Sequence, residues 1–387
     1  MKLVKKKSPE NEAVPVWDGL TEEVTEKDRE RFFHVVSIEL TGEQIDLVTT
    51  PALILPRQQE VLAVHWHPEY VPMELIEQRI CATFPNRKKS LIIPTQHNVL
   101  MSYGDYSGVE VDCYSRGFNR KVQLLLHFRT AALANASVLR AALEHTRKYR
   151  ASQLFDFIHT IIRPVAERLE KAAAETGADE QLIEFVRIHT AKVNTLLEEN
   201  LDAIPQDNVK NKLLRDFFNT LREEYGNTFI NRAQTFLRAV KLEVKKDFSP
   251  AFFYRTSEII EEARSLGGGI VIPHPEQFWP ILLAEYDVDG YEVWNPQSRE
   301  FTDFLITTVI NRNRHLGPSA RRLLVFTGDD THMGEKVKPA DEQDEQKMAR
   351  EIGVQPVWDD LAIRKKLIVA EMDRGNIIDE YAARLNG

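Results

Sequence analysis

Histidine and carboxylate side chains occur at the ends of several short apolar runs in this sequence. The clearest pair is His65 and His67, which follow the apolar run Val61–Val64. Side chains alternate between the two faces of a strand, so residues two positions apart share one face. Further candidates lie in or just after other predicted strands: His97, Glu110, His274, Asp330 and His332. Metal sites are assembled from such ligands, distant in sequence and gathered at one rim, so we expect a metal centre.

The types of these side chains indicate which metals would bind. Imidazole nitrogens mixed with carboxylate oxygens suit zinc, manganese or iron better than calcium or magnesium. Each residue also has a structural interpretation, such as Asp330 as the N-cap of a helix or Glu110 as a surface strand residue. One histidine pair is weak evidence, and the prediction depends on all seven candidates occurring together.

The elements that would position these side chains fall into two groups of predicted strands and helices. The strand before His65 is followed by a predicted helix, Pro72–Phe84, and by the apolar run Leu91–Pro94. A strand, a helix and a second strand in this order predict parallel pairing through a crossover. The alternation resumes near Gly267 and continues to the strand Arg322–Phe326, which gives about seven strands in all.

The remaining segments differ in pattern from residues 58–129 and 267–335, which carry this alternation. Residues 130–266 have helical spacing almost throughout and predict an inserted bundle of helices. Residues 1–57 predict a loose arm followed by the short strands Phe32–Leu40 and Ile45–Leu55, and residues 336–387 predict a helical tail. A chain of 387 residues fits one barrel of about 250 residues with a large insertion.

Composition limits the class of protein and its partners. A hydrophobic content of 43% and a charged content of 28% are ordinary for a globular protein. The net charge of −9 argues against nucleic acid as the main partner, although a local basic groove would remain compatible with it. Cys81 and Cys113 are too few for a disulfide framework, which fits a reducing cytoplasm. We find no signal peptide and no membrane-spanning run, and expect a cytoplasmic protein with no membrane partner.

Six local sequences occur in the order seen in the PHP family, which is named for its polymerase and histidinol phosphatase members. They are His65-Trp66-His67, Thr95-Gln96-His97-Asn98, Gly108-Val109-Glu110-Val111, Ile272-Pro273-His274-Pro275, Glu292-Val293-Trp294-Asn295 and Gly328-Asp329-Asp330-Thr331-His332. The chain resembles this family over residues 58 to 128 and 267 to 335. The resemblance implies an α/β fold, a distorted (β/α)7 TIM-like barrel, with the all-helical domain as an insertion.

The resemblance also implies two or three divalent metal ions at the C-terminal rim of that barrel. One ion would be held by His65, His67, Glu110 and Asp330. Glu110 would bridge to a second ion that also binds His97. His274 and His332 would bind a third ion or complete the second site.

The activity implied by the resemblance is that of a phosphoesterase, in which a metal-held hydroxide attacks a phosphate ester. His332 or His97, if not fully occupied by metal, would protonate the leaving group, and loss of Asp330 would remove metal and activity together. The candidate contacts to a small phosphorylated substrate are Arg116, Arg120, Asn295 and Arg299.

The sequence departs from the family pattern at two positions. Ala63 stands before the first histidine pair, where family members commonly have a nearby acid, and Gln96 precedes the third histidine. Two alternatives therefore stay open: a catalytically altered barrel that binds a partner through its helical insertion, and a metal-dependent hydrolase of C–N bonds. The helical insertion and the C-terminal tail are also candidate interfaces of a homo-oligomer.

Overall fold

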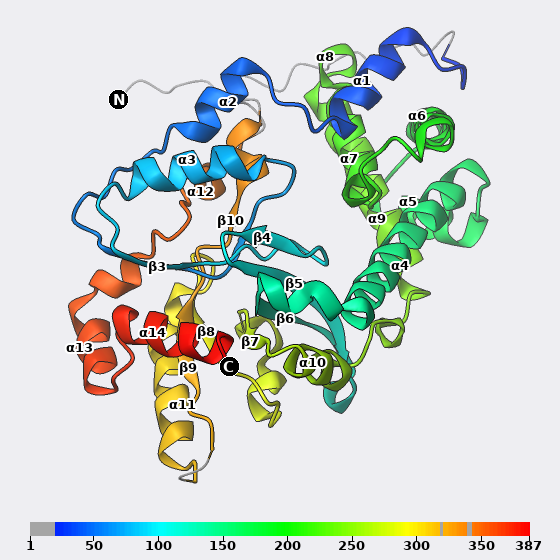
Figure 1. The fold of residues 1–387 in the computed structure, drawn as a ribbon. Coiled ribbons are helices and arrows are strands. Elements are labelled where there is room, and N and C mark those ends of the chain that lie inside the picture. The colour runs from blue at the N-terminus through cyan, green and yellow to red at the C-terminus, as the bar shows by residue number, and fades with distance from the viewer. Residues whose placement is uncertain (1–19, 318–319, 339–342) are drawn as a thin grey trace, which may run out of the picture. The chain divides into compact units, whose positions relative to one another are not determined.

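The computed structural model describes residues 20–317, 320–338 and 343–387 (Figure 1). The chain divides into two compact units. The helical unit combines the N-terminal residues through Ser37 with Arg150–Phe248, and the sheet unit combines Ile38–Tyr149 with Ser249–Gly387. All the candidate site residues belong to the sheet unit. Most of the predicted N-terminal arm lies outside the described residues.

The helical unit is built around a core of buried aromatic and aliphatic side chains that includes Phe32, Phe185 and Phe217. Its helices are α1 (Glu26–Val36), α5 (Ala166–Thr176), α6 (Glu180–Asn200), α7 (Lys212–Asn219), α8 (Arg222–Tyr225) and α9 (Asn227–Lys246), with the short 3-10 helix η3 (Gln206–Asn208). The residues of α4 (Ser137–Ile162) are divided between the two units. Gly177 ends α5 in a left-handed conformation with a φ of 69°, which glycine adopts without steric cost.

The largest sheet has six strands in the order β4-β5-β6-β7-β8-β9. These strands are β4 (Met101–Tyr103), β5 (Tyr106–Ser115), β6 (Arg120–Arg129), β7 (Gly269–Ile272), β8 (Gly290–Trp294) and β9 (Leu324–Thr327). The strands from β4 to β7 pair antiparallel, whereas β7, β8 and β9 pair parallel. Two separate parallel pairs join β1 (Glu60–Ala63) to β3 (Lys89–Ile92) and β2 (Trp66–His67) to β10 (Thr331–His332).

The predicted TIM-like barrel is wrong, because the described residues form no closed barrel. The strands β5 and β6 form a long antiparallel hairpin in which Tyr106 is opposite Arg129 and Ser115 is opposite Arg120 (Figure 1). An alternating barrel requires parallel neighbours, which this hairpin and the antiparallel pair β6–β7 exclude. The parallel crossover prediction is confirmed for β1, α3 (Met73–Thr83) and β3.

The two N-terminal strands were also predicted wrongly, because α1 and α2 (Gly42–Thr49) include the first part of each segment and the remainder of each is loop. Each helix begins with a capping box, in which the side chain of the N-cap residue and that of the third helical residue accept each other's backbone N–H groups. Thr25 and Asp28 form this motif at α1, and Thr41 and Gln44 form it at α2. These hydrogen bonds favour helix at segments whose apolar residues had suggested strands.

Helices and loops of the sheet unit cover the strands and complete its core. The helices are α10 (Thr256–Ser265), α11 (Thr302–Arg314), α12 (Glu345–Met348), α13 (Leu361–Val369) and α14 (Arg374–Leu385). The 3-10 helices are η1 (Arg116–Phe118), η2 (Thr130–Asn135), η4 (Pro250–Phe252), η5 (Pro275–Leu283), η6 (Arg299–Phe301), η7 (Met333–Val337) and η9 (Pro356–Asp359). Tyr381 of α14 packs on Phe326 of β9 with ring centroids 4.7 Å apart. No helix in the described parts of the chain is long and apolar enough to cross a membrane.

Candidate metal centre

Strand ends bring the seven predicted ligands together within the sheet unit. The parallel pair β2–β10 sets His67 opposite His332, and a single bridge sets His97 opposite Glu110 of β5. His274 follows β7. Three groups of side chains each place their ligand atoms within 4.8 Å of one another: His67, His97 and His332; His65, His67 and Asp330; and His65, Glu110 and His274.

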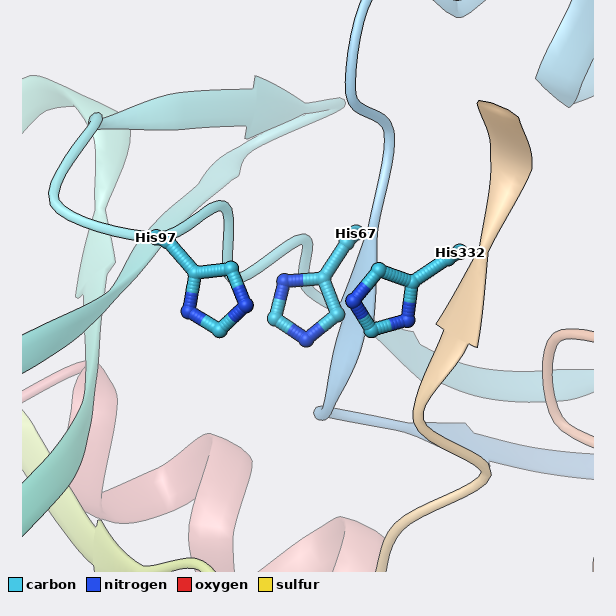
Figure 2. A group of neighbouring side chains, drawn as sticks. All are labelled: His67, His97 and His332. Carbon is cyan, nitrogen blue, oxygen red and sulfur yellow. The ribbon is translucent and has the colours of Figure 1, made fainter. Parts of the chain in front are cut away.

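His67 occupies the middle of a row of three imidazoles (Figure 2). Its ring lies 4.3 Å from that of His97 and 4.2 Å from that of His332, measured between centroids. Its Nε2 atom lies 3.4 Å from Asp330 Oδ1 and 3.7 Å from Glu110 Oε2. Nitrogen and carboxylate oxygen atoms therefore approach one another from several strands, as they do around a shared cation.

The carboxylate of Glu110 contacts His97 through one oxygen and His274 through the other. Its Oε2 atom is 2.5 Å from His97 Nδ1, and its Oε1 atom is 3.5 Å from His274 Nε2. The grouping differs from the one implied by the family resemblance, because Glu110 lies in a group with neither Asp330 nor His97. His274 lies with Glu110 and His332 lies with His97, so the two residues assigned to one third ion fall in different groups.

Several of these buried atoms have no hydrogen-bond partner among the residues that the structure describes. They are both ring nitrogens of His67, the Nδ1 atom of His274 and both carboxylate oxygens of Glu110, whose contacts with His97 and His274 are ion pairs without hydrogen-bond geometry. Leaving a buried polar atom unpaired costs about 1–3 kcal/mol, and more for a charged group. A divalent cation would bind such nitrogen and oxygen atoms together, so the donor set fits zinc, manganese or iron.

Glu292 controls the charge and orientation of His65. Its Oε2 atom lies 2.5 Å from His65 Nδ1, and both side chains are buried. Burial by itself lowers the pKa of an imidazole, but the Glu292 carboxylate outweighs it and raises the pKa of His65 to about 10. Asn295 Nδ2 donates to Glu292 Oε1 at 3.0 Å and fixes this carboxylate. Such a carboxylate orients a histidine through one ring nitrogen and leaves the other for the metal.

Three further buried groups, Glu110, Asp330 and His67, have pKa shifts that favour the form that binds a metal. Burial raises the pKa of Glu110, but the neighbouring charge of His97 holds that pKa well below its usual value. Burial also raises the pKa of Asp330, and here the contact with His67 lowers it below the usual range. Burial and the charge of His97 lower the pKa of His67. The two carboxylates are therefore ionised and His67 is neutral at pH 7, as metal binding requires.

Three residues around the centre were not predicted from the sequence. Glu292 left a signal in the sequence, because it is a charged residue inside the apolar strand β8, where its side chain is buried. Gln297 and Arg350 both donate to Asp330 Oδ2 at 3.0 Å. Arg350 gave no signal, because it lies 20 positions after Asp330 in a segment without a motif.

The predicted substrate contacts lie in different places. Arg116 and Arg120 are exposed at the turn between β5 and β6, and this end of the hairpin is about 17 Å along β5 from Glu110. Asn295 is buried and supports Glu292. Arg299 is exposed, and its guanidinium lies 5.9 Å from the ring centroid of Trp294, the last residue of β8.

The two departures from the family pattern have structural roles. Gln96 Oε1 accepts a hydrogen bond from the backbone N–H of Glu69 at 3.0 Å, which holds the turn after His67. Glu69 Oε2 in turn accepts from the backbone N–H of Gly334 at 2.8 Å. Ala63 is fully buried in the apolar cluster under β1 and β3. Neither Gln96 nor Ala63 takes the place of one of the seven predicted ligands.

The comparisons with known proteins give limited information. No family model and no curated protein matches the chain. Among solved structures, the chain is similar to a protein from Bifidobacterium adolescentis described as a "putative metal-dependent phosphoesterase". This similarity covers 81% of this chain and 97% of that chain, with a sequence identity of 16% and a TM-score of 0.40. So low a TM-score carries no conclusion about fold or activity, and the site geometry has to support any proposal.

Proposed function

We propose that the sheet unit binds two or three divalent metal ions and that the protein is a metal-dependent phosphoesterase. The observation that carries the proposal is the convergence of five imidazoles and two carboxylates, several of whose buried atoms make no hydrogen bond to the described residues. The ligands would be His65, His67, His97, Glu110, His274, Asp330 and His332. Histidine and carboxylate together suit zinc, manganese or iron.

The degree of burial assigns different roles to the ligands. His65, His67 and Glu110 are almost completely buried, so they would hold metal and make no contact with substrate. His97 and His332 have side chains that are 37% and 25% exposed, so a substrate could reach them from solvent. We assign them to the substrate side, where whichever imidazole is not fully occupied by metal would donate a proton to the leaving oxygen of an ester.

Bound divalent ions would supply Lewis acidity, which activates water and neutralises charge on phosphoryl oxygens. The residues of the chain would hold the reacting groups in place. Glu110 and Asp330 are ionised, and their negative charges offset those of the cations. Arg299 is the candidate phosphate contact, because its guanidinium is exposed beside the ring of Trp294. The carbonyl of Trp294 accepts a hydrogen bond from the backbone N–H of Gly328, two residues before Asp330.

Hydrolysis of chromogenic esters tests this proposal. The full chain, loaded in turn with manganese, zinc and iron, is incubated with p-nitrophenyl phosphate and bis-p-nitrophenyl phosphate. We expect one of the metals to support hydrolysis and Asp330→Ala to abolish it. His159→Ala serves as the matched control, because His159 lies in the helical unit and should not affect the rate. A chain that binds metal but hydrolyses neither ester nor a broader panel of phosphate esters would contradict the phosphoesterase assignment.

A further inference from the structure

The two oxygen atoms of the Asp330 carboxylate have different surroundings. Oδ1 faces the histidines, at 3.4 Å from His67 Nε2 and 3.7 Å from His65 Nε2. Oδ2 accepts hydrogen bonds from Arg350 Nη1 and Gln297 Nε2, both at 3.0 Å. The same Arg350 nitrogen also donates to the backbone carbonyl of Asp330 at 3.0 Å. Arg350 therefore holds both the side chain and the backbone of Asp330.

The backbone at Asp330 needs such support. Its φ of 49° lies in the left-handed region, which residues other than glycine adopt at a cost of about 1 kcal/mol or more. A residue keeps this conformation only where its surroundings impose it. The Asp330 N–H donates to the carbonyl of His65 at 2.9 Å, and Arg350 holds the Asp330 carbonyl on the other side of the residue.

Arg350 is itself fixed in position by its own segment. Its side chain is only 7% exposed. The buried Lys336 donates to the Arg350 carbonyl at 2.6 Å and lies 3.3 Å from Glu351 Oε1. Three residues after Arg350, the backbone N–H of Gly353 donates to Asp329 Oδ2 at 2.9 Å. The segment from Arg350 to Gly353 thus binds both acidic residues of the turn between β9 and β10.

We propose that Arg350 is a positioning residue for the metal centre. By occupying Oδ2, it leaves Oδ1 as the metal-binding oxygen of Asp330 and holds that oxygen toward His65 and His67. This inference rests on the proposed metal binding. The guanidinium is too buried to bind a substrate phosphate, and a carboxylate whose Oδ2 accepts two hydrogen bonds serves as a ligand with one oxygen.

The test is a cobalt(II) titration of the full chain after metal removal, followed by the visible absorption of the bound ion. The variants are Arg350→Met and Arg350→Lys. The control is Lys347→Met, because Lys347 is a cationic residue three positions before Arg350 whose side chain lies near Glu335. We expect Arg350→Met to weaken cobalt binding roughly 10- to 100-fold and to change the absorption spectrum, because the coordination of Asp330 changes. Arg350→Lys should restore part of the affinity, and Lys347→Met should bind like the wild type.

The outcomes separate positioning from general structural support. If Arg350→Met binds cobalt with unchanged affinity and spectrum, the proposal is wrong, even if the metal-free variant melts at a lower temperature. If Arg350→Met does not fold, Arg350→Lys decides the question: wild-type affinity and spectrum would overturn the proposal, and a weakened affinity with an altered spectrum would support it. A wild-type chain that binds no cobalt, zinc, manganese or iron would instead overturn the proposed function on which this inference rests.

Discussion

Two buried histidines, one in each unit, share most properties and differ in what surrounds them. His189 of the helical unit and His67 of the sheet unit are both buried, and neither has a hydrogen-bond partner at either ring nitrogen among the described residues. His189 lies among aromatic rings, including Phe185 at 4.5 Å between centroids. His67 lies among imidazoles and carboxylates, with Asp330 Oδ1 at 3.4 Å. Burial and an unpaired ring do not identify a ligand, whereas convergence with carboxylates does.

A third buried histidine also shows that burial alone does not identify a metal ligand. His127 of β6 lies in the core of the sheet unit, where its Nδ1 atom is 2.7 Å from the Tyr381 hydroxyl and its Nε2 atom is 2.9 Å from the Val64 carbonyl. Both nitrogens have partners, so His127 is a satisfied core residue with no ligand atom to offer. Burial lowers its pKa to about 3, as it does for His189. The local partners therefore distinguish a core histidine from a ligand.

The same substitution should weaken metal binding in the sheet unit and leave it unchanged in the helical unit. His67→Leu removes a residue that belongs to two of the three ligand groups, so we expect more than about a 100-fold loss of zinc or cobalt affinity. His189→Leu should leave this affinity unchanged, because His189 belongs to the helical unit and to none of the three ligand groups found among the described residues. Calorimetric titration of both variants measures the difference. Equal metal affinities for His67→Leu and the wild type would show that His67 is not a ligand.

Glu292→Gln should weaken the metal centre without removing a ligand. The amide cannot stabilise a charged His65 as the carboxylate does, so the pKa of His65 in the metal-free protein should fall from about 10. Metal affinity should drop roughly 10- to 100-fold, as is usual when an orienting partner is lost. NMR titration of the histidine signals and a metal titration provide the two measurements. An unchanged His65 pKa would show that Glu292 does not control this residue.

The surroundings of His189 predict an acid-sensitive helical unit. Burial lowers the pKa of folded His189 to about 3, whereas the unfolded value is about 6.5. As pH falls below 6.5 the unfolded chain takes up a proton that the folded chain does not, so stability is lost toward pH 3. Between pH 7 and pH 5 this loss is about 2 kcal/mol. His189→Leu should remove it, which thermal unfolding of both chains across this range would reveal as a smaller pH dependence in the variant.

The smallest effect we predict concerns the two capping boxes. Thr25→Ala in the helical unit and Thr41→Ala in the sheet unit should each cost about 1 kcal/mol of unfolding free energy. The loss should be larger for Thr25, because its partner Asp28 is buried and also accepts a hydrogen bond from Lys192 at 2.8 Å. Denaturant unfolding measures both values. A larger loss for Thr41→Ala would contradict this ranking.

The sequence indicated which side chains lie close together, and their role as ligands stays a prediction, whereas the architecture was predicted wrongly. All seven proposed ligands lie together in the structure, because each follows or belongs to a strand whose apolar residues are recognisable. The direction of the strands was not readable in the same way. A run such as Leu124–Phe128 looks alike in a parallel and an antiparallel sheet, so its spacing does not show that the turn at Asn119 reverses the chain into a hairpin.

The residues that support the ligands, such as Arg350, were not predicted from the sequence for a different reason. Glu292 could have been identified as a charge in an apolar strand, but the interaction of Arg350 with Asp330 depends on how the segment after residue 343 folds back. Long-range contacts of this kind leave no periodic pattern in the sequence. The helices α1 and α2 did leave a local signal, in the spacing of Thr25 and Asp28 and of Thr41 and Gln44.

The most direct test of the account is the metal content of the full chain purified without added metal or chelator, expressed as ions per chain. The account predicts two or three ions of zinc, manganese or iron, and a clear reduction in His67→Leu but not in His189→Leu. A content near zero that stays there after incubation with each of these metals would contradict the proposed metal centre.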